Sequence, residues 1–180
     1  MIITLSGSAG SGKSTVAKIV AKKLNYTHYS TGDYMRQMAE DRKISLLELS
    51  KIAEKDQSID EELDQWQIDL GKKKDNFIID GRLSFHFIPK AVKIYLYADI
   101  KEMAKRILAD SIRKEHNINL KSTIKNIETR KKSEQKRYMI YYKINPYEKK
   151  HYDLVINTTK LAAEEAADKI VDYVKKLKKQ

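Results

Sequence analysis

The chain carries the segment Gly7-Ser8-Ala9-Gly10-Ser11-Gly12-Lys13-Ser14-Thr15 between a short apolar run and a pattern typical of an amphipathic helix. A strand, a glycine-rich turn and a helix in this order form the setting of a phosphate-binding P-loop. Small residues let successive backbone N–H groups point into one cup, and the helix adds the positive end of its dipole. We expect Lys13 to reach the β- and γ-phosphates of ATP, and the Ser14 hydroxyl to ligate Mg²⁺.

This P-loop pattern is specific, because it fixes two glycines, one lysine and one serine or threonine at set spacings. With ordinary residue frequencies it arises by chance in a chain of this length less than about once in a hundred. The alternative is a flexible turn with a solvated lysine, which would require neither the strand before it nor the helix after it. We therefore predict that residues 7–15 bind a nucleoside triphosphate.

Length and composition limit the class of protein. The 180 residues are enough for a sizeable core, and we expect a single domain over residues 1–180. The chain has no cysteine, which excludes disulfides and thiolate metal sites. No apolar run is long enough to span a membrane, and the first is too short for a signal peptide. We expect a cytoplasmic protein without a membrane partner, most simply a monomer.

The formal net charge of +11 has two interpretations. One is a nucleic-acid-binding surface. The other, which we favour, is a lysine-rich composition with a pocket for several phosphates, so a nucleic-acid partner is not expected. Because lysine is the usual cation here, an arginine indicates a site where a planar fork for phosphate oxygens is needed. There are seven arginines: Arg36, Arg42, Arg82, Arg106, Arg113, Arg130 and Arg137.

Short β-prone runs alternate with helical patterns along the chain. The runs lie at residues 2–5, 26–30, 77–79, 92–97 and 152–156. Such alternation predicts an α/β fold, a doubly wound sheet of five parallel strands with helices on both faces. Ligands of this fold bind at the carboxyl ends of the strands.

The helical patterns predict where the sheet is interrupted. No strand pattern occurs between residues 34 and 74, so we expect a helical insertion over about residues 31–74. We expect Thr31 or Asp33 to cap a helix from Tyr34, and Ser45 with Glu48 to form a capping box. Further helices are expected at residues 59–73, 100–114, 120–142 and at the end of the chain.

Two more glycine–arginine clusters follow the second and third expected strands. The first is Tyr29-Ser30-Thr31-Gly32-Asp33-Tyr34-Met35-Arg36, and the second is Asp80-Gly81-Arg82. In a parallel sheet both clusters lie at the same edge as the P-loop. One phosphate group does not need all of these donors, whereas two phosphate-carrying substrates would.

The order of these motifs resembles the nucleoside monophosphate kinases, and most closely the archaeal-type cytidylate kinases. The likeness covers nearly the whole chain, and it includes the P-loop, Ser30-Thr31-Gly32-Asp33 with Arg36, and Asp80-Gly81-Arg82-Leu83. It also includes a helix with Arg106, a basic lid segment at 128–138, and Tyr152-Asp153-Leu154-Val155-Ile156-Asn157-Thr158. The lid is expected at about residues 110–145.

The resemblance implies phosphoryl transfer from Mg·ATP to a monophosphate, CMP or dCMP. The implied metal site is Ser14 with Asp80, which would organise the waters around Mg²⁺, and Asp33 is a weaker candidate. The implied catalytic residues are Lys13, Arg82, Arg106, Arg130 and Arg137, with the last three closing from the lid side. The implied monophosphate site consists of Ser30, Thr31, Gly32, Asp33, Arg36, Gly81 and Arg82.

The chain departs from the family pattern in three places. Leu83 follows Asp-Gly-Arg, and the Gly-Phe-Pro-Arg run of adenylate kinases is missing, which argues against AMP. Phe85-His86-Phe87 stands where related sequences often have Gly-Trp, so the preferred base stays open. Asp110 falls near the position where many of these enzymes have a second lid arginine, and Arg113 would have to take over that role. Arg42 and Arg113 have no motif around them, and we assign both to the surface.

Two alternatives remain open from the sequence. One is a kinase of the same fold that uses AMP, UMP or a non-nucleotide acceptor. The other is a P-loop RNA-binding or regulatory protein that grips RNA with its basic helix. For Arg130 and Arg137, which lie about two helical turns apart, the alternative to a lid role is a solvated surface with pairs such as Arg130–Glu134.

Overall fold

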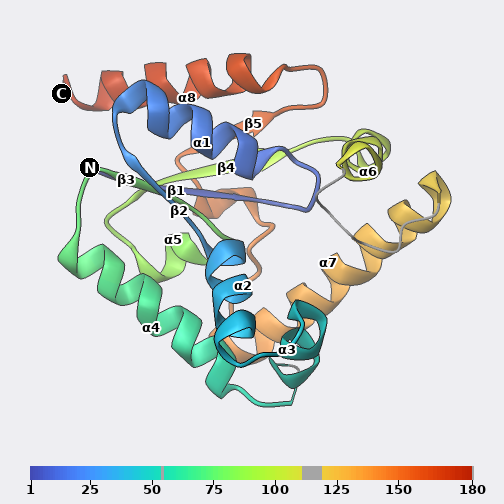
Figure 1. Cartoon of the computed structure of the whole chain (residues 1–180). Helices are drawn as coiled ribbons and strands as arrows, with labels where there is room; N and C mark the ends of the chain where they lie inside the picture. The colour runs from blue at the N-terminus through green and yellow to red at the C-terminus, as the bar shows by residue number, and fades with distance from the viewer. Residues whose placement is uncertain (54, 111–118, 180) are drawn as a thin grey trace.

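The structure of the chain is a computed structural model, and it describes residues 1–53, 55–110 and 119–179. Within these residues five strands form one parallel sheet in the order β2-β3-β1-β4-β5 (Figure 1). This confirms the doubly wound α/β fold expected from the sequence. The strands are β1 (Ile2–Gly7), β2 (Thr27–Ser30), β3 (Phe77–Asp80), β4 (Val92–Tyr97) and β5 (Leu154–Asn157).

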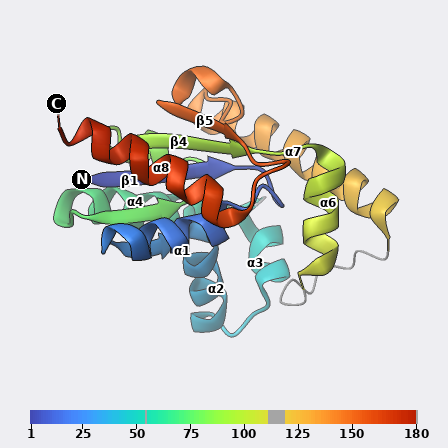
Figure 2. The same cartoon turned by 90° about the horizontal axis from the view of Figure 1, so that it is seen from above.

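Helices cover both faces of the sheet. α1 and α8 lie together on one face, while α4 and α5 lie on the other (Figures 1 and 2). Every helix described between β2 and β3 belongs to the expected insertion. The helices are α1 (Lys13–Leu24), α2 (Thr31–Asp41), α3 (Leu46–Ala53), α4 (Ser58–Lys73), α5 (Ser84–Phe87), α6 (Ile100–Ala109), α7 (Leu120–Tyr142) and α8 (Ala163–Leu177).

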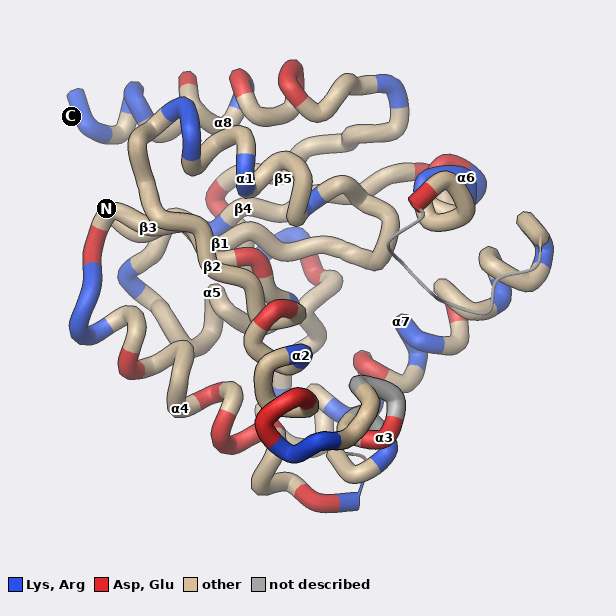
Figure 3. The backbone as a smooth tube through the Cα atoms, in the orientation of Figure 1, with Lys and Arg blue, Asp and Glu red and all other residues tan. Residues whose placement is uncertain are grey.

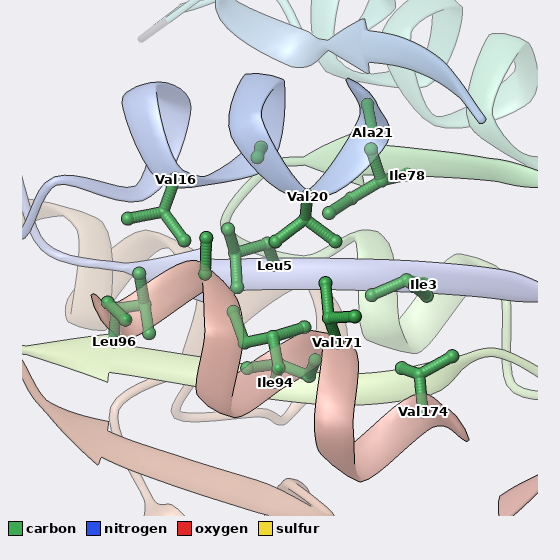
Figure 4. Close-up of a cluster of buried hydrophobic side chains, with 14 of the residues drawn as sticks. Ile3, Leu5, Val16, Val20, Ala21, Ile78, Ile94, Leu96, Val171 and Val174 are labelled. Carbon is green, nitrogen blue, oxygen red and sulfur yellow. The ribbon is translucent and has the colours of Figure 1, made fainter. Parts of the chain in front are cut away.

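The core follows from the alternation of side chains along each strand. Ile3 and Leu5 of β1 point to the face covered by α1 and α8, where they join Val20 and Val174 (Figure 4). Ile2 points to the opposite face. Each of these side chains is nearly or fully buried, and burying a residue of this size contributes about 1.5–3 kcal/mol. The core therefore holds the central strands and the loops that follow them in fixed positions.

The strand register brings the three sequence clusters together. In the parallel pairing, Asp80 of β3 lies opposite Leu5 of β1 and opposite Ser30 of β2. The loops after β2 and β3 consequently begin at the same level of the sheet, and β1 continues two residues further, to Gly7, before the P-loop begins. This places the P-loop, the start of α2 and the Asp80-Gly81-Arg82 cluster at one edge.

Three local details differ from the sequence predictions or extend them. The capping box of Ser45 and Glu48 is confirmed, since the Glu48 N–H donates to Ser45 Oγ and the Ser45 N–H donates to Glu48 Oε2. The prediction that α2 begins near Tyr34 is wrong, because the chain enters the helix at Thr31, directly from the extended residue Ser30. The short helix α5 was not predicted.

The expected lid is described in part. Its residues 111–118, which include Arg113 and the expected continuation of α6, lie outside the described residues. The helix α7 begins with a capping interaction in which the Ser122 N–H donates to the Asn119 side chain, 2.9 Å away. α7 then reaches the insertion, where Tyr142 hydrogen-bonds Asp64 of α4. No helix in the described part of the chain is long and apolar enough to cross a membrane.

Candidate active site

The loop after β1 has the backbone of a phosphate cup. Gly10 and Gly12 adopt left-handed conformations, with φ of 79° and 86°, which glycine adopts without strain. A Cβ atom at Gly10 would also lie 2.5 Å from the Met103 carbonyl oxygen, so this position has no room for a side chain. The helix α1 begins directly at Lys13, and its positive end adjoins the loop. The loop therefore offers an anion both backbone donors and a helix terminus.

Asp80 links the P-loop to the strand β3. Ser14 Oγ donates to Asp80 Oδ1 over 3.0 Å, and His28 Nε2 lies 2.8 Å from Asp80 Oδ2. Burial acts to raise the pKa of Asp80, but the His28 hydrogen bond, the charge of Lys13 and the Ser14 hydrogen bond lower it below its usual value. Asp80 is therefore a buried carboxylate at neutral pH.

The residues Ser14 and Asp80 fit a magnesium site. Mg²⁺ prefers oxygen ligands and usually keeps several waters while it binds substrate phosphates. The paired hydroxyl and carboxylate supply oxygen atoms beside the phosphate cup, and the charge of Asp80 suits a cation. The exposed Asp33, in contrast, forms an ion pair with Arg36 of the same helix, α2. The geometry thus fits Asp80, the stronger of the two carboxylates that the sequence offered for the magnesium site.

A pocket of about 410 Å³ extends from the P-loop to the space between α6 and the start of α8. Arg106 lines it and is held by Thr158, whose carbonyl oxygen lies 2.7 Å from Arg106 Nη2. Thr158 Oγ1 donates in turn to the Ser11 carbonyl, 2.9 Å away. Asp110 also lines this pocket. Arg106 is therefore fixed relative to the phosphate cup, where a triphosphate would meet it.

The start of α2 packs against the end of β3. Thr31 Oγ1 donates to the Asp80 carbonyl over 3.3 Å, and a Cβ atom at Gly81 would lie 2.6 Å from Thr31 Cγ2. Gly81 therefore has to be glycine for these two segments to meet. Of the seven predicted acceptor residues, Ser30, Thr31, Gly32 and Gly81 belong to this contact region, while Arg36 is exposed beside Asp33.

Glu134 connects α7 to the edge of the sheet. Its carboxylate forms ion pairs with Arg82 Nε and with Arg130 Nε, the latter at 3.0 Å, and it accepts a hydrogen bond of 2.5 Å from Tyr147. Burial acts to raise the pKa of Glu134, but the charges of Arg82 and Arg130 lower it below its usual value. Two predicted catalytic arginines thus converge on one buried carboxylate, and the Arg130–Glu134 pair weighed from the sequence is part of this cluster.

Arg137 lies apart from that cluster, against the insertion helix α4. Its Nη1 atom is 3.7 Å from Asp60 Oδ2, and its guanidinium lies over the ring of Tyr138. The neighbouring Asp64 accepts a hydrogen bond of 2.5 Å from Tyr142. Figure 3 shows basic residues distributed along α7 and acidic residues along α4. The structure therefore places Arg137 beside α4 and does not bring it to Arg82.

A family model confirms what these features indicate. The model of the cytidylate kinase-like family matches residues 2–160, from β1 to beyond β5. The chain belongs to this family. It is therefore an enzyme, a nucleotide-binding kinase of the transferase class, as the resemblance had implied.

Curated relatives match the chain over most of its length. The cytidylate kinase of Methanothermobacter thermautotrophicus is 38% identical over 164 residues, which are 91% of this chain and 99% of that protein. The cytidylate kinase of Natronomonas pharaonis is 40% identical over 164 residues, 90% of this chain and 83% of that protein. Both likenesses agree with membership of the cytidylate kinase-like family.

Solved structures support the fold. A shikimate kinase from Bacteroides thetaiotaomicron superposes with a TM-score of 0.67 at 16% identity, covering 100% of this chain and 99% of its own. A protein from Eubacterium ventriosum ATCC 27560, described as uncharacterized, gives a TM-score of 0.75 at 20% identity and covers 97% and 98%. At these identities the likeness concerns the P-loop kinase fold of the family alone.

Some residues of this family member's site were not among the site residues predicted from the sequence, although Glu134 was considered there as a surface partner of Arg130. They are His28 and Thr158, which support Asp80 and Arg106, and the carboxylates Glu134, Asp60 and Asp64. The signal for His28 was present, because it lies two positions before Ser30 on β2, and Ser30 pairs with Asp80. The four-residue spacing of Asp60 and Asp64 placed both on one helix face. The sequence did not indicate that α7 packs against that face of α4.

A pH-dependent contribution to stability is expected from Asp64. Burial raises its pKa to about 6, although the Tyr142 hydrogen bond opposes the rise. Since the folded protein then binds this proton more tightly than the unfolded chain, the stabilisation is present below about pH 4 and is lost as the pH rises through about 6. We expect Asp64→Asn to remove this pH-dependent loss of stability.

The measurement is the melting temperature of wild type and Asp64→Asn between pH 4 and pH 8. The variant should gain stability relative to wild type as the pH rises, with most of the gain between about pH 4 and pH 6. Asp69→Asn is the matched control, because Asp69 is a partly exposed residue of α4 whose pKa is lowered by its hydrogen bonds with Lys73 and Gln65. A constant difference between Asp64→Asn and wild type across the pH range would contradict the assignment.

Proposed function

We propose that this enzyme transfers the γ-phosphoryl group of ATP to CMP or dCMP, giving ADP and CDP or dCDP. The observation that carries the proposal is the Ser14–Asp80 hydrogen bond, because it joins the P-loop to the strand that continues into Gly81 and Arg82. A donor and an acceptor phosphate bound to these two segments would lie side by side. The names of the curated relatives support a cytidine nucleotide as the acceptor.

On the donor side, the backbone of residues 7–15 and Lys13 would hold the triphosphate. Ser14 would bind Mg²⁺ and Asp80 would orient its waters, and the ion would supply positive charge to the β- and γ-phosphates. Arg106, held in place by Thr158, would add charge from the α6 side. These residues neutralise and align the phosphates, which is most of what phosphoryl transfer requires of a protein.

On the acceptor side, Arg36 and Arg82 would hold the monophosphate. An oxygen of this phosphate then attacks the γ-phosphorus in line, the bond to the β-phosphate oxygen breaks, and ADP leaves. Arg82 already binds a carboxylate, an anion that guanidinium recognises in the same two-pronged manner as phosphate. Arg130 would approach the transferring group when the lid closes, and closure would exclude the water that hydrolyses ATP.

The test is a panel of acceptors at fixed Mg·ATP, with ADP formation as the readout. CMP, dCMP, UMP, AMP and shikimate would each be supplied under identical conditions. We expect CMP or dCMP to give the highest kcat/KM. Activity with shikimate alone, or with none of the nucleotides, would contradict the proposal.

The cytoplasmic location, the monomeric state and the absence of a nucleic-acid partner stay predictions. A small-molecule kinase in the cytoplasm needs neither a second subunit nor a nucleic acid for the proposed chemistry. The RNA-binding alternative requires tight, strongly salt-dependent RNA binding and no ADP formation that depends on a monophosphate. The same panel, repeated with added RNA, distinguishes the two.

A further inference from the structure

Glu134 is a buried carboxylate that accepts hydrogen bonds from three segments of the chain. Arg130 Nε, one turn earlier on α7, donates to Glu134 Oε1 over 3.0 Å. Arg82 Nε, from the loop after β3, and the Tyr147 hydroxyl, from the loop after α7, both donate to Oε2. The two oxygens of one carboxylate thus bring the guanidinium groups of Arg82 and Arg130 side by side.

Packing alone does not require a charge at the position of Glu134. A buried ion pair contributes little net stability, because removing both groups from water offsets most of their attraction. Apolar contacts already join this part of α7 to the sheet edge, since Tyr138 packs in the same cluster as Leu83 and Phe85. A carboxylate that only fastened α7 would therefore be redundant, and its placement between two arginines calls for a second explanation.

Arg82 is held at both its backbone and its guanidinium. Ser6 Oγ, buried in β1, donates to the Gly81 carbonyl over 2.9 Å and lies 3.4 Å from the Arg82 carbonyl oxygen. These contacts fix the backbone of Arg82 to the strand that leads into the P-loop, while Glu134 binds the guanidinium. Only 15% of the Arg82 side chain is exposed. The direction of the guanidinium relative to the P-loop is therefore set by Glu134.

We propose that Glu134 is a positioning residue for phosphoryl transfer, which holds Arg82 and Arg130 together so that the acceptor phosphate meets both. The inference rests on the proposed function, which assigns these two arginines to the acceptor and to the transferring group. The hydrogen bonds to Glu134 use the Nε donor of each arginine, and a guanidinium has five N–H donors in all. A phosphate can therefore bind the same guanidinium groups while Glu134 sets their direction.

The acceptor phosphate would join this cluster and would not displace Glu134. Displacement would separate a buried carboxylate from its arginines, and an uncompensated buried charge is strongly destabilising. Glu134 stays charged at neutral pH, since Arg82 and Arg130 hold the pKa of its carboxyl below the usual value. Neutralising Glu134 distinguishes the two possibilities. The affinity for the acceptor falls if Glu134 positions the arginines, and it rises if Glu134 competes with the phosphate.

The decisive variant is Glu134→Gln, with kcat/KM for CMP and KM for ATP measured at a temperature where the variant is folded. Glutamine has the same shape but lacks the charge that orients two guanidinium groups. Because hydrogen bonds to charged groups are the stronger ones, kcat/KM for CMP should fall about 10- to 100-fold, while the KM for ATP stays within about twofold. Glu128→Gln, at an exposed position of the same helix, is the matched control and should leave both unchanged.

Cytidine separates positioning from a general disturbance of α7. It lacks the phosphate that Arg82 and Arg130 would bind. Its inhibition constant, measured in competition with CMP, should therefore be the same in Glu134→Gln and in wild type. A variant that weakens cytidine, CMP and ATP by the same factor would overturn the inference and leave Glu134 a structural contact.

Tyr147→Phe is the second variant if Glu134→Gln does not fold. It removes one donor from Glu134 Oε2 and keeps the charges of the cluster, so kcat/KM for CMP should fall by about 3- to 10-fold. Unchanged CMP kinetics in the variants that fold, or a lower KM for CMP in Glu134→Gln, would overturn the inference while the proposed function stands. If wild type phosphorylates no monophosphate, the proposed function fails, and the inference fails with it.

Discussion

Lys13→Ala should lower kcat by about 10²- to 10³-fold, the usual cost of removing one preorganised group that stabilises charge in the transition state. Lys13 is the first residue of α1 and is buried at the P-loop, where it contributes to the lowered pKa of Asp80. Its loss removes positive charge from the position where the β- and γ-phosphates would bind. The measurement is kcat at saturating Mg·ATP and CMP.

The control for Lys13→Ala is Lys18→Ala, an exposed position on the same helix. This variant should keep kcat within about twofold of wild type, because surface substitutions away from the site have small effects. A Lys13→Ala enzyme with near-normal kcat would show that the P-loop lysine does not act on the transferring group.

Arg82→Ala is expected to be the most damaging change outside the P-loop, because it affects both stability and activity. It would leave Glu134 buried beside Arg130 without its second guanidinium, and breaking a buried pair on one side costs about 3–5 kcal/mol. It would also remove a phosphate-binding fork from the acceptor site, so kcat/KM for CMP should fall by about 10² or more. The KM for ATP should change little.

The double variant Arg82→Ala/Glu134→Gln separates these two effects. Neutralising the stranded carboxylate should restore much of the free energy of unfolding, as double-mutant cycles of coupled pairs show. Activity should not return, since the guanidinium that binds the acceptor is still missing. If the double variant regains CMP kinetics close to wild type, Arg82 serves the fold and not the acceptor.

The sequence predicted those parts of the site that lie close together along the chain. Residues 7–15 contain the whole P-loop, and the alternating pattern with buried strands was sufficient for the five-stranded parallel sheet. Strand topology predicted that the Asp80-Gly81-Arg82 cluster lies at the same sheet edge as the P-loop, and the hydrogen bond between Ser14 and Asp80 agrees with this. These predictions succeeded because strand topology alone brings such residues together.

Local sequence patterns did not predict the contacts that α7 makes. The position of α7 against α4 decides which arginine meets Glu134 and which meets Asp60. No sequence periodicity encodes that position. Arg130 and Arg137 were expected on one face because they are seven residues apart, yet they meet different partners, since the face runs along both Arg82 and α4. The start of α2 was misplaced because Thr31 and Asp33 have the composition of capping residues, whereas the sheet register already fixes Ser30 as the boundary.

We propose that one enzyme binds a donor and an acceptor phosphate at neighbouring strand ends and transfers a phosphoryl group between them. ATP labelled in its γ-phosphate, incubated with the enzyme, Mg²⁺ and CMP, tests this most directly. We expect the label to appear in the β-phosphate of CDP, in an amount equal to the ADP formed. Label found only in inorganic phosphate, at the same rate with and without CMP, would contradict it.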